Sequence, residues 1–210
     1  YTLNNDKYKI SKYFQYFYPE FNSFYDKKMK EEVEEQYKEL ISYGIDAFNK
    51  QREEGENDLT ICSMIRNDSI DDFITYINEK SIKLNGTIDP SIYESNNYLM
   101  TKNPSLIEYS AFFGSLQILK FLSLSKVELT PSLWLYSIHG KNGEMIHFLE
   151  ESDVRPKNFT FKDCLYEAIK CHHNDIAEYI RNSKLDLKDD QKDLNNVGLE
   201  NINYFYLPDD

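Results

Sequence analysis

The chain has 210 residues, 40% of them hydrophobic and 29% charged, which is typical of a globular protein rather than a disordered one. Its formal net charge of −12 disfavours binding to nucleic-acid phosphates or to anionic membranes, and no basic patch offsets this charge. Only 7 glycines and 6 prolines argue against a loop-rich or all-β chain, whereas 17 tyrosines and 13 phenylalanines suit helices packed through aromatic rings.

The cysteines and the hydropathy indicate where the protein resides. Cys62, Cys164 and Cys171 lie on apolar stretches and predict buried, reduced thiols. No signal peptide is recognisable, and no apolar run is long enough to span a membrane. We therefore expect a cytoplasmic protein without membrane insertion.

Residues 1–58 predict an aromatic-rich helical region. Because Pro19 interrupts its first apolar stripe, we expect a short helix, a break, and a new helix with Pro19 in its first turn. A second amphipathic stripe predicts one helix over about 27–52, with a charged face toward solvent. The rings of the first stripe are Phe14, Phe17, Tyr18, Phe21, Phe24 and Tyr25.

Residues 59–182 carry a two-helix unit that recurs four times, over about 59–84, 104–129, 131–151 and 161–182. The steps between units are about 45, 27 and 31 residues, and a period near 30 predicts a stacked solenoid. Such units must stack to bury their apolar stripes, which produces an extended surface rather than a pocket. When the four units are aligned, seven equivalent positions match, and we call each such position a column. The first column is Ile61, Ile107, Trp134 and Leu165, and the third is Ile65, Ala111, Ile138 and Ile169. The fourth column is Phe73, Ile118, Met145 and Ile176, and the seventh is Ile77, Leu122, Leu149 and Ile180.

Turn-forming residues separate these units. Residues 81–104 contain Asn-Gly, Asp-Pro and Asn-Pro pairs and predict a loop, on the edge where solenoid insertions often bind partners. Ser105 and Ser132 each follow a proline and fall near the start of a helix, where serine caps well. Gly114 is expected to end the first helix of the second unit. Residues 183–210 form an acidic tail whose apolar end either caps the last unit or binds a partner.

The segment SLIEYSAFFGSLQILKFL, residues 105–122, resembles an ankyrin repeat. Ile107, Ser110, Ala111 and Gly114 fall where that motif has Leu, Ala, Ala and Gly. The whole of 59–182 is similar to a family of ankyrin-like proteins known only as a domain of unknown function and expanded in certain protists. The resemblance implies an all-α, ankyrin-like helix-turn-helix repeat solenoid, with 1–58 as an aromatic-rich helical cap on the stack. The histidine of the ankyrin Thr-Pro-Leu-His motif is missing in every unit, so another hydrogen bond must replace it.

No pattern in the chain indicates catalysis. Nucleophile elbows, glycine-rich nucleotide loops and Walker loops are missing, and the paired carboxylates are expected by chance in so acidic a chain. None of the four histidines has metal-ligand spacing: His139 and His147 are expected on different helices of one unit, and His172 and His173 in a turn or on the surface. We therefore predict no catalytic residue, no cofactor and no metal ion, and a protein that is not an enzyme. Trp134, the sole tryptophan, is expected in the core, with partner contact as the alternative.

The predicted function is a non-catalytic protein–protein interaction module that uses the repeat surface. The negative charge suggests a protein partner with a basic face, steered by electrostatics. The alternative is a structural subunit of a larger assembly, such as a cytoskeletal one, because both ends of the chain are rich in aromatic residues. The oligomeric state stays open. The candidate contact residues, expected to be exposed, are Glu108, Phe112, Tyr136, Tyr166 and, within the 81–104 insert, Tyr93 and Tyr98.

Overall fold

The computed structural model describes residues 16–24, 26–185 and 197. Over these residues the chain is helical, as predicted, and contains no β-strand, only an isolated antiparallel bridge between Thr87 and Ser105. The chain divides into two compact units. Residues 1–59 and 89–103 form one, called here the aromatic unit, and residues 60–88 and 104–210 form the other, the hairpin unit. No helix in the described ranges combines the length and the hydropathy needed to cross a bilayer.

The aromatic unit contains a helix break that the sequence analysis missed. The prediction of one helix over 27–52 is wrong, because the chain turns between α3 and α4, where Gly44 has a φ of 98°. Glycine adopts this conformation without the penalty that a Cβ would impose. Pro19 lies in the first turn of α2, as predicted, whereas Phe14 and Tyr25 lie outside the described residues. The helices are α2 (Tyr18–Phe21), the 3-10 helix η1 (Asn22–Phe24), α3 (Lys27–Leu40), α4 (Ile45–Glu54) and α7 (Asn97–Lys102).

A row of rings forms the core of the aromatic unit. Tyr18 packs on Tyr37, Tyr37 on Phe48 and Phe48 on Tyr93, with centroids 4.6, 5.4 and 5.9 Å apart. All four side chains are buried. The guanidinium of Arg52 lies over the Phe48 ring of this row, 5.4 Å from its centroid. Aromatic packing therefore stabilises this unit, as the tyrosine and phenylalanine content indicates.

The predicted loop over 81–104 is only partly a loop. Helix α7 lies within it, because the side-chain oxygen of Asn96 accepts hydrogen bonds from the N–H groups of Tyr98 and Leu99 and caps the helix. Residues 89–103 belong to the aromatic unit. The backbone N–H and the hydroxyl of Ser95 both donate to the Gly55 carbonyl, at 2.9 and 2.7 Å.

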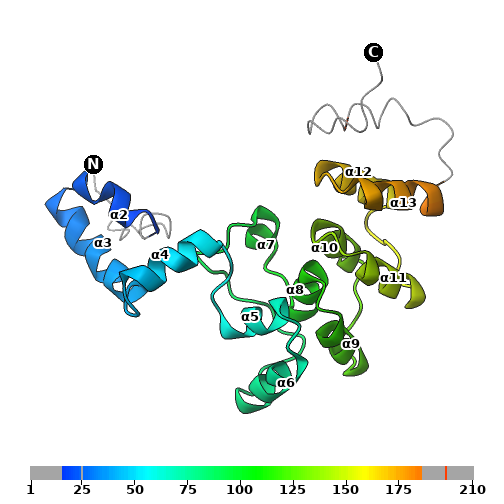
Figure 1. The fold of residues 1–210 in the computed structure, drawn as a ribbon, viewed down its shortest axis with the longest axis horizontal. Coiled ribbons are helices and arrows are strands. Elements are labelled where there is room, and N and C mark those ends of the chain that lie inside the picture. The colour runs from blue at the N-terminus through cyan, green and yellow to red at the C-terminus, as the bar shows by residue number, and fades with distance from the viewer. Residues whose placement is uncertain (1–15, 25, 186–196, 198–210) are drawn as a thin grey trace, which may run out of the picture. The chain divides into compact units, whose positions relative to one another are not determined.

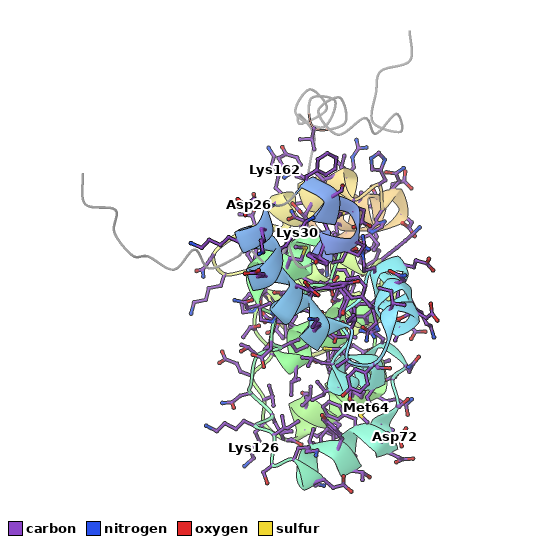
Figure 2. The ribbon with its side chains drawn as sticks, turned by 90° about the vertical axis from the view of Figure 1, so that its left-hand side faces the viewer. Asp26, Lys30, Met64, Asp72, Lys126 and Lys162 are labelled. Carbon is purple, nitrogen blue, oxygen red and sulfur yellow. The ribbon has the colours of Figure 1, made fainter. Side chains whose placement is uncertain are left out.

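The hairpin unit consists, over its described residues, of four helical hairpins that follow one another in chain order (Figure 1). The first helix of each hairpin contacts the first helix of the next: α5 contacts α8, α8 contacts α10, and α10 contacts α12. Exposed side chains such as Asp72 and Lys126 point outward from the ribbon (Figure 2). The helices are α5 (Thr60–Arg66) and α6 (Ile70–Glu79), α8 (Leu106–Phe113) and α9 (Leu116–Leu124), α10 (Leu133–His139) and α11 (Gly143–Glu151), and α12 (Phe161–Lys170) and α13 (Asn174–Lys184).

Four of the seven aligned columns form the core of the hairpin unit, whereas the sixth column, Tyr76, Phe121, Phe148 and Tyr179, is half-buried. No side chain of the first, third, fourth or seventh column is more than 8% exposed. Trp134 is 1% exposed, and its indole N–H donates to the Val154 carbonyl at 2.8 Å, which confirms its prediction as a core residue. The buried hydroxyls of Ser110 and Ser137 each donate to a carbonyl four residues earlier, so neither is left unpaired.

The turn within each hairpin has one geometry, repeated four times. A residue with left-handed backbone conformation follows the end of the first helix. The backbone N–H of the residue after it donates to the carbonyl of the residue five positions earlier in the chain, at 2.9 to 3.1 Å. This is the Schellman helix ending, and Gly114 ends α8 in this way, as predicted. The left-handed residues are Asp68, Gly114, Lys141 and His172. The hydrogen-bonded pairs are Ser69–Met64, Ser115–Ser110, Asn142–Ser137 and His173–Ala168.

The second helices of the first three hairpins also share one ending. The left-handed residues are here Ser81, Lys126 and Asp153, each four positions after its seventh-column residue. The N–H that follows each of them donates to the carbonyl of that seventh-column residue, at 2.9 or 3.0 Å. In the last hairpin α13 ends differently, because Leu185 continues in extended conformation.

Hydrogen bonds also join hairpins that are distant in the sequence. The two carboxylate oxygens of Asp68, in the turn of the first hairpin, accept from the N–H groups of Gln117 and Ile118, each at 3.0 Å. Asp68, from the neighbouring hairpin, therefore supplies acceptors to two N–H groups in the first turn of α9 that have no partner within that helix. The Ser115 hydroxyl donates to the Ile65 carbonyl across the same boundary.

Candidate functional site

Three of the six residues predicted for partner contact are buried. Phe112, Tyr136 and Tyr93 are 8, 3 and 5% exposed, so the expectation that they lie on the surface is wrong. Phe112 and Tyr136 lie on α8 and α10, each of which has a neighbouring first helix on both sides. A helix flanked on two sides buries more than one stripe of its surface. Tyr93 lies in the core of the aromatic unit.

Glu108 is half-buried and already bonded within the hairpin unit. Its carboxylate accepts from the N–H and hydroxyl of Ser105, at 2.9 and 2.8 Å, which closes a capping box at the start of α8. It also accepts from the Ser132 hydroxyl, at 2.6 Å. Ser105 caps as predicted, whereas Ser132 does not cap α10 and bonds to Glu108 instead. Glu108 therefore links the starts of two successive first helices.

The other two candidates keep part of their surface in solvent. Tyr166 and Tyr98 are half-buried. The ammonium of Lys162 lies 5.5 Å from the Tyr166 centroid, and that of Lys102 lies 6.0 Å from the Tyr98 centroid. Tyr166, on α12, belongs to the hairpin unit, whereas Tyr98, on α7, belongs to the aromatic unit. The six residues are therefore divided between the two units, and three of them are buried.

Another set of side chains connects the ends of the first helices. Arg66, the last residue of α5, donates to the Tyr109 hydroxyl at 3.0 Å, and its guanidinium lies 6.0 Å from the Phe113 centroid. The Phe112 ring stacks on the imidazole of His139, with centroids 6.5 Å apart and planes 20° apart. These contacts join α5 to α8 and α8 to α10.

His139 continues the series to α12. Its Nε2 lies 3.0 Å from the Glu167 carboxylate, and its Nδ1 lies 3.5 Å from the Cys171 sulfur. Because a carboxylate only accepts, Nε2 carries a proton toward Glu167, and Nδ1 faces the Cys171 sulfur. We call the whole set the first-helix ladder. Its members are Arg66, Tyr109, Phe112, Phe113, His139, Glu167 and Cys171.

The end of the ladder combines three different donor atoms. His139, Glu167 and Cys171 are each half-buried, and one ligand atom from each lies within 4.8 Å of the others. The hydrogen bond with His139 lowers the pKa of Glu167 although burial opposes it, and Lys170 lowers it further. Burial raises the pKa of Cys171 to about 11, and the charge of Glu167 acts in the same direction. The thiol is therefore protonated at neutral pH and is a poor nucleophile.

Sequence reasoning missed this cluster because its members are far apart in the chain. His139 and Cys171 are 32 residues apart, which no short ligand motif covers. The aligned columns do contain a signal. His139 directly follows its third-column residue, Ile138, and Cys171 comes two residues after Ile169. Both therefore lie at the same end of neighbouring first helices.

A second polar cluster joins the second helices of the last two hairpins. The Glu150 carboxylate on α11 lies 2.5 Å from the Lys184 ammonium on α13 and accepts from the Tyr179 hydroxyl at 2.7 Å. Burial alone would raise the pKa of Glu150, but the hydrogen bonds from Lys184, Tyr179 and His147 lower it overall. A cavity of about 220 Å³ is lined by Tyr179, His147 and neighbouring residues. All charges in this cluster are paired, so we assign it a packing role.

The two units differ in charge. Residues 60–88 and 104–185 carry 12 Lys and Arg against 14 Asp and Glu, which is close to neutral. The described part of the aromatic unit, 16–24, 26–59 and 89–103, carries 7 against 14. Most of the negative charge that predicted a basic partner therefore lies outside the described hairpins.

Comparison of the chain with family models, with curated proteins and with solved structures yields no match in any of the three. The fold itself defines an all-α protein in which helical hairpins pack through matched columns.

Proposed function

We propose that the chain is a non-catalytic protein-interaction module whose four hairpins form an ankyrin-like repeat solenoid. The repeated turn geometry and the burial of matched columns support the solenoid assignment. The proposed binding surface is the first-helix face, defined as the half-buried ladder members Arg66, Phe113, His139, Glu167 and Cys171 together with Tyr166 and Lys170. The other ladder members, Tyr109 and Phe112, are buried and hold Arg66 and His139 in place. The partner is a second protein.

The first-helix ladder is the observation that carries this proposal. It takes side chains from the first helices of four successive hairpins and holds each by a named contact. Side chains that are already ordered lose little conformational entropy when a partner binds. Arginine and aromatic residues are also enriched at the energetic centres of protein interfaces. An extended, pre-ordered row of this kind suits a polypeptide better than a small molecule.

Quantitative affinity capture from the native cytosol tests the proposal. The bait is the full chain, compared with a face variant carrying Arg66→Ala, Tyr166→Ala and Lys170→Ala. The matched control carries Lys120→Ala, Leu124→Ala and Lys126→Ala, which are exposed positions on or just after a second helix. We expect the amount of partner captured by the face variant to fall at least about tenfold, as for hot-spot residues. The control should capture as much partner as the unchanged chain. Equal capture by all three baits would refute the proposed surface.

A structural subunit of a larger assembly is the second candidate, and exposed rings favour it. In the aromatic unit Tyr43 is 90% exposed and Phe24 is 80% exposed. Large exposed rings of this kind can pack against a neighbouring chain in an assembly. Sedimentation velocity separates the two functions: an interaction module stays monomeric at high concentration, whereas an assembly subunit self-associates. Self-association that Tyr43→Ser and Phe24→Ser relieve would favour the subunit.

A further inference from the structure

Three potential metal ligands meet where the third and fourth hairpins pack together. His139 is the last residue of α10, Glu167 lies on α12, and Cys171 directly follows α12. Glu167 and Cys171 are four residues apart, so their side chains project from one face of the helix. The contact between α10 and α12 brings His139 to the same face.

The distances suit a tetrahedral ion. Zinc bonds of about 2.1 Å to nitrogen and 2.3 Å to sulfur, at a tetrahedral angle, place these two atoms about 3.6 Å apart. The His139 Nδ1 and the Cys171 sulfur are 3.5 Å apart. The Glu167 carboxylate lies 3.0 Å from the other ring nitrogen and holds the imidazole with its Nδ1 toward the sulfur.

We propose that His139, Glu167 and Cys171 bind one divalent transition-metal ion with the chemistry of Zn²⁺. The ion displaces the Cys171 proton to solvent, so that Nδ1 supplies nitrogen and the resulting thiolate supplies sulfur. Glu167 exchanges its hydrogen bond to the ring for a bond from one oxygen to the ion. A mixed nitrogen, oxygen and sulfur set favours zinc-like ions over calcium or magnesium, which prefer oxygen ligands alone. The ion clamps α10 to α12, and its fourth position stays open to water or to a partner's ligand.

Neighbouring residues support a specific site. Cys164 and Cys62 are 0% exposed, so neither thiol competes for an added ion. Lys170 is exposed, and its ion pair with the Glu167 carboxylate is long, at 3.4 Å. Its ammonium can therefore move into solvent when an ion binds. His172 is exposed and adjacent to Cys171 in the sequence, which makes it a matched control.

Titration of the full chain with Co²⁺, followed by competition with Zn²⁺, tests the proposal. We expect one ion per chain, with a thiolate-to-cobalt charge-transfer band and the visible bands of tetrahedral Co²⁺. Cys171→Ser should abolish the charge-transfer band, and His139→Asn and Glu167→Gln should weaken Zn²⁺ binding at least about tenfold. His172→Ala should bind as the unchanged chain does. Zn²⁺ should also raise the melting temperature of the unchanged chain, because the ion binds only the folded state.

Circular dichroism of each variant separates loss of the site from loss of the fold. A folded Cys171→Ser variant without the charge-transfer band supports the site, and His139→Asn supplies the same test if that variant fails to fold. The proposal is overturned if Co²⁺ produces no thiolate band with the unchanged chain. It is also overturned if His172→Ala weakens binding as much as His139→Asn does, since the ion would then be adventitious.

Discussion

Replacing Gly140 by alanine should destabilise the hairpin unit by about 3 kcal/mol, at the upper end of the usual cost of overpacking. A Cβ at this position would lie 1.6 Å from the Phe112 carbonyl oxygen and 2.6 Å from its carbon. Both are backbone atoms of α8, so no side-chain rotation can relieve the clash. Since φ at Gly140 is −78°, alanine would not be strained conformationally, and the whole effect reports how closely α8 approaches α10.

Urea denaturation followed by circular dichroism measures this effect, and Gly143→Ala is the matched control. Gly143 is three residues away, at the start of α11, and a Cβ there would meet nothing within 4 Å. Alanine also favours helix over glycine by up to about 1 kcal/mol, so the control should be unchanged or slightly more stable. A Gly140→Ala variant as stable as the unchanged chain would show that the two helices do not pack this closely.

Trp134→Ala should cost about 3–5 kcal/mol, the usual range for removing a buried aromatic side chain. The indole packs edge-on against the Phe161 ring, with centroids 5.0 Å apart. Its loss would also leave the buried Val154 carbonyl without its hydrogen bond at 2.8 Å. Trp134→Phe retains a ring and should cost less, and Leu124→Ala, at a side chain that is 85% exposed, should cost almost nothing.

Chemical denaturation of the three variants gives these free energies, and fluorescence of the unchanged chain checks the premise. Trp134 is the sole tryptophan, so its native emission should be blue-shifted and poorly quenched by iodide, and should shift red on unfolding. Emission that is already red-shifted and fully quenchable in the native protein would contradict the burial of Trp134.

The helices of the hairpin unit were predictable because their packing repeats. Each first helix uses the same positions against its neighbours, so Ile65, Ala111, Ile138 and Ile169 share one environment and one column. The turn at Gly114 was predictable because glycine alone is unstrained at positive φ. By contrast, Lys141 occupies the same left-handed position without a compositional signal.

Features that depend on packing between elements were not predictable. The turn before Gly44 interrupts an apolar stripe that reads as one helix, because periodicity records which face is apolar and not whether the axis continues. Phe112 and Tyr136 were expected on the surface because a single helix gives no indication of neighbours on both sides. To predict the cluster of His139 with Cys171, one must know how α10 packs against α12. The column alignment indicates that these two helices are neighbours, but it does not give the distance between individual side chains at their ends.

The central claim is that the four hairpins share one turn and one packed seam, and amide hydrogen exchange resolved by NMR tests it most directly. We predict that the N–H groups of Ser69, Ser115, Asn142 and His173 are each protected by at least about a thousandfold, because each is bonded to the helix before it and the seam opens only when the unit unfolds. Exchange of these four amides at the rate of an unstructured peptide would contradict the shared turn and the seam behind it.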